Sequence, residues 1–216
     1  MNVMLDLETL GTRPGSVIVS IGAVAFDLDG LHDEFAIGID IADAQREGLT
    51  ICGDTVRWWM GKSPEARTVF SSAGAPLHTA LAAFSQWFST VPSFPKVQIW
   101  GNGASFDLSL LGEAYTRMGM ARPWRYQDER CHRTLVALRP DIPWVRPEVA
   151  HQALSDARAQ AEHAAKILAA ISNPDEHRAR TQLTTLAQAL GVEASSANAH
   201  DQALHRAIHL AAREAT

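Results

Sequence analysis

Val3-Met4-Leu5-Asp6-Leu7-Glu8-Thr9 is an apolar run that ends in two carboxylates two residues apart. In a strand, residues i and i+2 point to the same face, so Asp6 and Glu8 are expected to project together. Two acids at the end of a buried strand cost folding free energy unless a positive charge lies between them. Oxygen ligands suit Mg²⁺ or Mn²⁺, so this stretch predicts a divalent cation site.

The regions around this stretch alternate between strand and helix patterns. Two more strands are expected directly after it, and two others further along the chain. The pattern predicts an α/β fold with a mixed five-stranded sheet flanked by helices. The expected strands cover residues 17–26, 34–40, 96–100 and 125–128. The expected helices include residues 54–60, a helix starting at 63–65, and residues 76–88, 105–118, 151–171, 176–190 and 198–215.

Length, composition and charge argue against a membrane protein, a disulfide-rich protein and a protein that coats nucleic acid. The 216 residues predict one domain over 1–172 and a helical C-terminal extension over 173–216. No apolar run approaches the roughly 20 residues that span a bilayer, and no basic leader precedes the first strand. Cys52 and Cys131 cannot form a disulfide framework or a zinc site, which predicts a reduced, cytoplasmic protein. The net charge of −5 argues against a protein that coats nucleic acid, but not against a nuclease.

Three motifs occur in order along the chain. They are Asp6-Leu7-Glu8-Thr9-Leu10-Gly11, Asn102-Gly103-Ala104-Ser105-Phe106-Asp107 and His151-Gln152-Ala153-Leu154-Ser155-Asp156-Ala157. They resemble the motifs of the DEDDh 3′–5′ exonucleases, a superfamily that includes RNase T, oligoribonuclease and a polymerase proofreading subunit. Each motif alone also fits a solvated strand end, a helix first turn or a surface helix. The resemblance covers roughly residues 2–171 and implies a ribonuclease-H-like fold.

The resemblance implies a role for each charged residue of the motifs. Asp6 would bridge two metal ions, Mg²⁺ with Mn²⁺ as a substitute. Glu8 and Asp156 would complete the site of the ion that activates the attacking water. Asp107 would support the second ion, and His151 would act as general base. A histidine near its ordinary pKa of about 6.5 can accept a proton at neutral pH.

The resemblance also implies contacts with the substrate. Thr9, Leu10 and Gly11 form the turn that meets the terminal nucleotide in this family, with backbone amides at the sugar and an apolar side chain at a base. Asn102 is expected to contact substrate, whereas Phe106 fits both a core position, which we favour, and a base-stacking one.

The segment Thr55-Val56-Arg57-Trp58-Trp59 is similar to one in a small exoribonuclease branch known from mycobacteria and phages or prophages. On a helix the two rings point about 100° apart, so one is expected in the core and the other at substrate or at a subunit contact. Trp59 is taken as the substrate contact.

For two further sets of residues, a purely structural role explains the pattern at least as well as a role in binding. Arg130 and Arg133, which follow Asp128, could hold a phosphate or simply solvate the start of a helix. His205 and His209 have helical spacing, but without a third ligand they indicate a polar helix face rather than zinc.

The sequence therefore predicts a metal-dependent 3′–5′ exonuclease that shortens single-stranded RNA or DNA to nucleoside 5′-monophosphates, with RNA slightly preferred. The alternatives are a proofreading or repair exonuclease within a polymerase or recombination complex, and an inactive nucleic-acid-binding module. The extension offers Leu183, Leu186 and Leu190 as an apolar face, so a homodimer is left open.

Overall fold

The structure, a computed structural model, describes residues 1–71, 73–145, 147, 150–173, 182 and 185. The chain divides into one compact unit over Met1–Ile167 and a second over Leu168–Thr216. Several predictions for the extension lie outside the described residues. They are the helices at 176–190, apart from residues 182 and 185, and at 198–215, the possible zinc ligands His205 and His209, and the apolar face of Leu183, Leu186 and Leu190. The boundary predicted between residues 172 and 173 stays a prediction.

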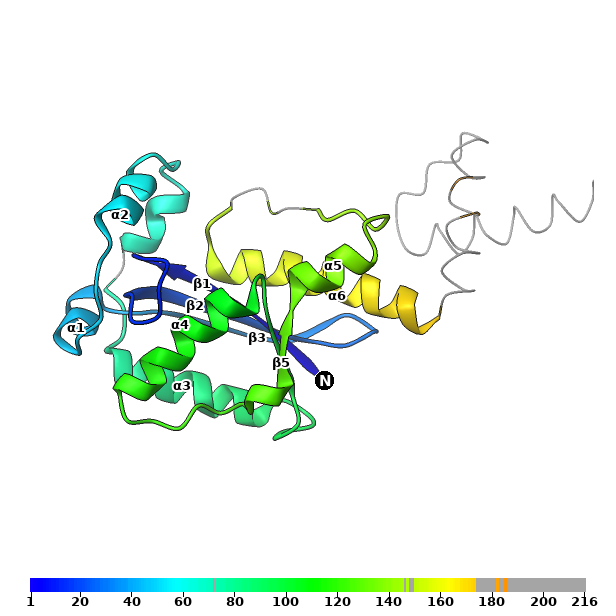
Figure 1. Cartoon of the computed structure of the whole chain (residues 1–216), viewed down its shortest axis with the longest axis horizontal. Helices are drawn as coiled ribbons and strands as arrows, with labels where there is room; N and C mark the ends of the chain where they lie inside the picture. The colour runs from blue at the N-terminus through cyan, green and yellow to red at the C-terminus, as the bar shows by residue number, and fades with distance from the viewer. Residues whose placement is uncertain (72, 146, 148–149, 174–181, 183–184, 186–216) are drawn as a thin grey trace, which may run out of the picture. The chain divides into compact units, whose positions relative to one another are not determined.

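A mixed five-stranded sheet forms the centre of the first unit (Figure 1). The strand order is β3-β2-β1-β4-β5, with β1 antiparallel to β2 and parallel to β4. This arrangement confirms the predicted α/β fold of the ribonuclease-H-like type. The strands are β1 (Asn2–Thr9), β2 (Ile18–Phe26), β3 (Leu31–Gly38), β4 (Gln98–Gly101) and β5 (Glu129–Cys131).

Helices cover both faces of this sheet. The helical elements are α1 (Ile41–Arg46), α2 (Gly53–Met60), η1 (Ala66–Phe70), α3 (Leu77–Thr90), α4 (Ala104–Arg117), η2 (Tyr126–Asp128), α5 (His132–Leu138) and α6 (Ala153–Ser172). Helices α3 and α4 lie against one face, and α6 lies against the other (Figure 1). Val3, Leu5 and Leu7 belong to the core that includes α3 and α4. The alternating side chains of β1, including Asp6 and Glu8, therefore face α6.

Helix α6 approaches the sheet closely. Ala157, Ala161 and Ala164 are fully buried, and their small side chains leave little space between helix and sheet. A Cβ atom on Gly22 of β2 would lie 2.2 Å from the carbonyl carbon of Ala153. Glycine at this position therefore lets the first turn of α6 contact the strand backbone.

The structure corrects the predicted fifth strand. Residues 126–128 form the short helix η2, and the strand begins only at Glu129. Arg125 Nε donates to Asp128 Oδ2 at 2.5 Å, an i to i+3 ion pair that closes a turn where an extended chain was expected. Helix α2 also starts one residue earlier than expected, at Gly53, with Cys52 at its N-cap.

Candidate active site

The sheet opens where β1 passes the end of β4. The two strands pair only as far as Leu5 and Gly101. Asp6, the next residue, lies opposite Gly22 of β2, and Glu8 projects from the same face two residues later. The end of β1 therefore holds both carboxylates at the mouth of a cavity of about 1250 Å³.

Helix α4 adds a third carboxylate. Asp107 lies in the first turns of the helix and is only 3% exposed. A Cβ atom on Gly101 would lie 2.9 Å from Asp107 Oδ2, so the glycine at the end of β4 leaves room for this side chain. The turn after β4, with Gly103 at φ +111°, directs the helix back along the sheet.

Helix α6 supplies the fourth carboxylate, which also binds the backbone of the two residues directly before the helix. Asp156 Oδ2 accepts hydrogen bonds from the backbone N–H groups of His151, at 2.7 Å, and Gln152, at 3.1 Å. His151 has a φ of 68°, a left-handed conformation that such local hydrogen bonds help to hold. Asp156 therefore sets the backbone that carries the predicted general base.

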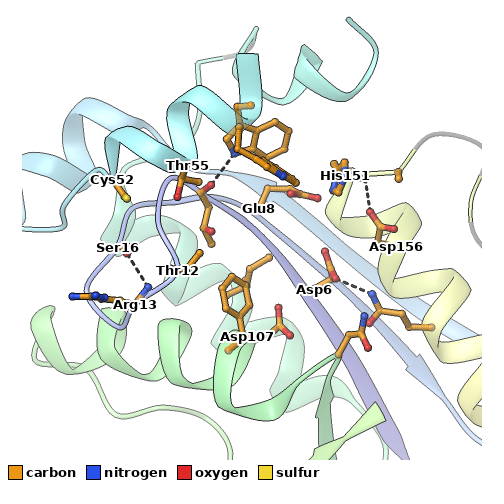
Figure 2. Close-up of a pocket in the computed structure, with 18 of the residues that line it drawn as sticks. Asp6, Glu8, Thr12, Arg13, Ser16, Cys52, Thr55, Asp107, His151 and Asp156 are labelled. Carbon is orange, nitrogen blue, oxygen red and sulfur yellow. Dashed lines mark hydrogen bonds between the residues drawn. The ribbon is translucent and has the colours of Figure 1, made fainter. Parts of the chain in front are cut away.

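The carboxylates converge in space as predicted. Single oxygen atoms of Asp6, Glu8 and Asp156 lie within 4.8 Å of one another (Figure 2). Asp107 lies outside this group of three but close enough for its charge to raise the pKa of both Asp6 and Glu8. One cluster thus gathers side chains from β1, α4 and α6.

Burial and mutual repulsion hold these acids toward their protonated forms. Burial is the main cause that raises the pKa of Asp6, followed by the charges of Asp107 and Glu8. Burial and then the charge of Asp156 raise the pKa of Glu8 to about 8, and burial raises that of Asp107 to about 7. Among the residues that the structure describes, none of the four carboxylates forms an ion pair. An all-oxygen cluster whose acids form no ion pair with a described residue fits a divalent cation such as Mg²⁺.

Gln160 of α6 is part of this site, although the sequence analysis missed it. Its Nε2 donates to Asp6 Oδ1 at 2.8 Å, and the residue is 2% exposed. Its Oε1 is buried and accepts no hydrogen bond from a described residue. The one signal in the sequence is its spacing, four residues after Asp156 and hence on the same side of the helix.

His151 lies against an aromatic wall. Its ring meets those of Trp58 and Trp59 edge to face, with centroids 4.8 and 5.9 Å away. Lys62 Nζ lies 3.9 Å from the centre of the Trp58 ring. Burial first, and then the charge of Lys62, lowers the pKa of His151, while Asp156 opposes the shift. The lowered pKa favours the neutral imidazole, which is the form that can accept a proton.

One tryptophan is buried and the other is exposed, as predicted. The buried one is Trp59, however, which had been expected to contact substrate. Trp58 is 45% exposed, whereas Trp59 is 3% exposed and its indole N–H donates to the Thr9 carbonyl at 2.9 Å. Trp59 is therefore a core residue that holds the end of β1. Both line the cavity, and Trp58 offers the larger exposed surface.

The turn after β1 was expected to contact the terminal nucleotide, but only part of it lies at the cavity. Thr9 lines the cavity, but Leu10 is buried in the hydrophobic core, which does not fit the predicted contact of its side chain with a base. The Leu10 N–H donates to Val17 at 2.9 Å, so this amide is also occupied. Gly11 packs against Ser16, whose Oγ would lie 2.3 Å from an added Cβ.

Of the remaining expected contacts, three lie at the cavity. Asn102 and Phe106 line it, and Phe106 also packs against the core. Arg133 lines it as well, and its charge lowers the pKa of Asp107. Arg130 instead donates to the carbonyl oxygens of Gln127 and Glu129, away from the cavity lining.

The first 168 residues match the family model of the Rv2179c-like domain, described as a 3′-5′ exoribonuclease. The chain belongs to this family. The match confirms the predicted resemblance to the 3′–5′ exonuclease superfamily. No helix of the described residues is long and apolar enough to cross a membrane.

Individual relatives are more distant. The chain is 26% identical over 119 residues to an exodeoxyribonuclease of Enterobacteria phage T4, an alignment covering 50% of this chain and 52% of the relative. The chain thus spans about half the length of that relative. Solved structures also match, among them two nucleases. One is the cell-death related nuclease 4 (CRN-4), with a TM-score of 0.44 and 13% identity over 81% of this chain and 65% of that one. The other is a 3′-exonuclease, with a TM-score of 0.41 and 10% identity over 77% and 81%.

Proposed function

We propose that this exonuclease hydrolyses single-stranded nucleic acid from the 3′ end to nucleoside 5′-monophosphates, with Mg²⁺ bound at the carboxylate cluster. The observation that supports it best is the convergence of Asp6, Glu8 and Asp156 within 4.8 Å at the mouth of a large cavity. The partner is thus a 3′ end of RNA or DNA.

The carboxylates would hold two ions. Asp6 would contact both, Glu8 and Asp156 would complete one site, and Asp107 would support the other. When bound, such ions stabilise the charge on the attacking and leaving oxygens of a phosphodiester. Gln160 holds one oxygen of Asp6 and so fixes the direction of the remaining lone pairs.

His151 would accept the proton of the attacking water. Its lowered pKa favours the neutral ring, and the wall of Trp58 and Trp59 orients it. Asp156 accepts a hydrogen bond from the backbone of His151 and also belongs to the carboxylate cluster. The proposed base would therefore keep a fixed position relative to this proposed metal ligand. Trp58 is the ring that could stack on a base, a contact of about 1–3 kcal/mol.

We place RNA slightly ahead of DNA as substrate, because the matching family is described as an exoribonuclease. DNA is the second candidate, supported by the printed name of the phage T4 relative.

The test uses one sequence made as 5′-labelled RNA, as 5′-labelled DNA, and as duplexes with 3′ overhangs. Each is incubated with Mg²⁺, Mn²⁺ or EDTA. We expect stepwise shortening from the 3′ end only with metal, release of nucleoside 5′-monophosphates, and faster cleavage of the RNA. Cleavage of neither backbone with either metal would leave a nucleic-acid-binding module and refute the proposal. Faster cleavage of DNA would reverse the substrate preference alone.

A further inference from the structure

A chain of buried polar contacts runs from the cavity to the loop before His151. His132 Nδ1 of α5 lies 3.3 Å from Asn102 Oδ1, and His132 Nε2 lies 3.2 Å from His163 Nδ1 of α6. His163 Nε2 lies 2.9 Å from the carbonyl oxygen of Ile142 and donates to it. The two histidines are 0% and 2% exposed, so these contacts lie away from bulk solvent.

The number of protons in this chain determines how Asn102 is oriented. Three hydrogen bonds in series need three protons, whereas two neutral imidazoles carry only two. Either the histidine pair carries an extra proton and Asn102 Oδ1 accepts from His132, or the amide is turned over and its Nδ2 donates to His132. A half-turn of the amide exchanges Oδ1 and Nδ2 with almost no change of shape.

The surroundings favour the neutral pair. Among the described residues, no carboxylate forms an ion pair with His132 or His163 that would offset a buried positive charge. Burial, and then His163, lowers the pKa of His132 to about 4. Trp144 stacks on His163 at an interplanar angle of 3° and meets His132 edge to face, which restricts rotation of both rings.

We propose that the neutral His132–His163 pair turns the Asn102 amide so that its Oδ1 faces the cavity, where it accepts a hydrogen bond from a hydroxyl of the 3′-terminal sugar. This inference rests on the proposed function. In this state Asn102 Nδ2 donates to His132, and each imidazole carries its proton on Nε2. The two histidines are positioning residues, because they act on substrate only through Asn102.

A sugar hydroxyl is the substrate group that fits this acceptor. Asn102 lines the cavity beside Asp107, where the scissile phosphate would meet the carboxylate cluster. An acceptor oxygen repels phosphate oxygens but accepts from a hydroxyl. The sugars on either side of that phosphate are the nearest donors, and the terminal one carries a free 3′-hydroxyl in both RNA and DNA.

The first test reads the histidines directly and does not depend on activity. Long-range ¹H–¹⁵N correlation spectra of the wild-type protein at neutral pH report which nitrogen of each imidazole carries the proton. We expect both buried rings to be neutral with the proton on Nε2. A doubly protonated ring, or an Nδ1 proton on His132, would overturn the inference even in a fully active enzyme.

The second test asks whether Asn102 recognises the hydroxyl. Oligonucleotides of the backbone that the enzyme cleaves are made with a normal, a 2′-deoxy or a 3′-deoxy terminal sugar. In the wild type, loss of the recognised hydroxyl should lower kcat/KM for the terminal linkage roughly 3- to 10-fold. In Asn102→Leu, normal and deoxy ends should be cleaved equally. An undiminished preference in Asn102→Leu would overturn the contact.

The third test connects the histidines to the substrate. His132→Leu should lose the same preference for a hydroxylated end while keeping the Mg²⁺ affinity measured by calorimetry. His78→Leu, at an exposed histidine of α3, is the matched control and should keep the preference. A folded His132→Leu protein with the wild-type preference would contradict the proposal. If the wild type cleaves no nucleic acid, the proposed function fails, and the spectra still decide the histidine protonation.

Discussion

Asp6 is the residue on which the cluster depends most. Gln160 stabilises its ionised form, while three neighbouring acids oppose it. We expect Asp6→Asn to lower turnover on the order of a thousandfold, because an amide cannot neutralise a bound cation. The same change should raise the melting temperature in EDTA by a few degrees, because it removes like-charge repulsion at a buried site.

Nuclease assays with Mg²⁺ and thermal unfolding in EDTA measure these two effects separately. Asp29→Asn, at an exposed aspartate of the β2–β3 turn, is the control and should change neither. Near-wild-type turnover of Asp6→Asn would show that the metal assignment is wrong.

His151 combines a chemical role with an unfavourable backbone conformation. We expect His151→Ala and His151→Gly both to lower turnover roughly 100- to 10,000-fold through loss of the base. At a φ of 68°, glycine is strained less than alanine, so His151→Gly should be the more stable variant by about 0.5–1 kcal/mol. Chemical denaturation measures the difference between the two.

Mg²⁺ affinity distinguishes a base from a ligand in these variants. Both should bind Mg²⁺ as the wild type does in calorimetry. A clear loss of affinity in the two variants would mean that His151 had been assigned the wrong role.

At the scale of elements, the position of α6 depends on its contact with β2. An alanine at position 22 would bring its Cβ within 2.2 Å of the Ala153 backbone, which cannot move aside as a flexible side chain can. We expect Gly22→Ala to cost about 2–4 kcal/mol of folding stability and to lower activity, because α6 carries Asp156 and Gln160.

The matched control makes the same substitution within a helix. Gly112→Ala in α4 meets only Arg122 Nη1, at 3.6 Å, and should gain up to about 1 kcal/mol from helix propensity. Both variants are compared by chemical denaturation and by nuclease assay. Unchanged stability of Gly22→Ala would show that α6 can withdraw from the sheet at little cost.

The elements also show what the sequence could and could not predict. The alternation of β1 predicted that Asp6 and Glu8 share a face, and the motif order predicted that Asp107, His151 and Asp156 would join them. The sequence predicted that Leu10 contacts a base, but its side chain is buried in the hydrophobic core. Residues 125–128 were misread because a local ion pair decided their conformation.

The histidine pair shows a different limit. His132 and His163 are 31 residues apart, and neither lies in a pattern that indicates a partner. Only the packing of α5 against α6 brings them together. Such contacts depend on the tertiary structure, and the hydrophobic periodicity of the sequence does not predict them.

At the scale of the whole molecule, pH and metal should act on stability together. Glu8 has a pKa of 4.5 when unperturbed and of about 8 in the folded protein. The folded chain therefore binds more protons than the unfolded chain in this range, and the metal-free protein should lose stability as the pH rises through it. His132, lowered from 6.5 to about 4, acts in the opposite direction and costs stability as the pH falls through that range.

Mg²⁺ should remove the loss at high pH, because it replaces the protons on the clustered carboxylates. We expect the rise in melting temperature on adding Mg²⁺ to be small near pH 5 and to grow up to about pH 8.5. Thermal unfolding with Mg²⁺ or EDTA across this range tests the expectation, with Asp6→Asn as the control that should respond less. An increment independent of pH would contradict the raised pKa values.

The two hydrogen bonds that Asp156 accepts have a consequence for how the enzyme responds to its surroundings. They are made entirely within the polypeptide, so the backbone of His151 is set before any ion arrives. Activation by metal then requires no slow rearrangement of the backbone at His151 and Gln152. The enzyme is expected to follow rises and falls in free Mg²⁺ on the timescale of ion exchange.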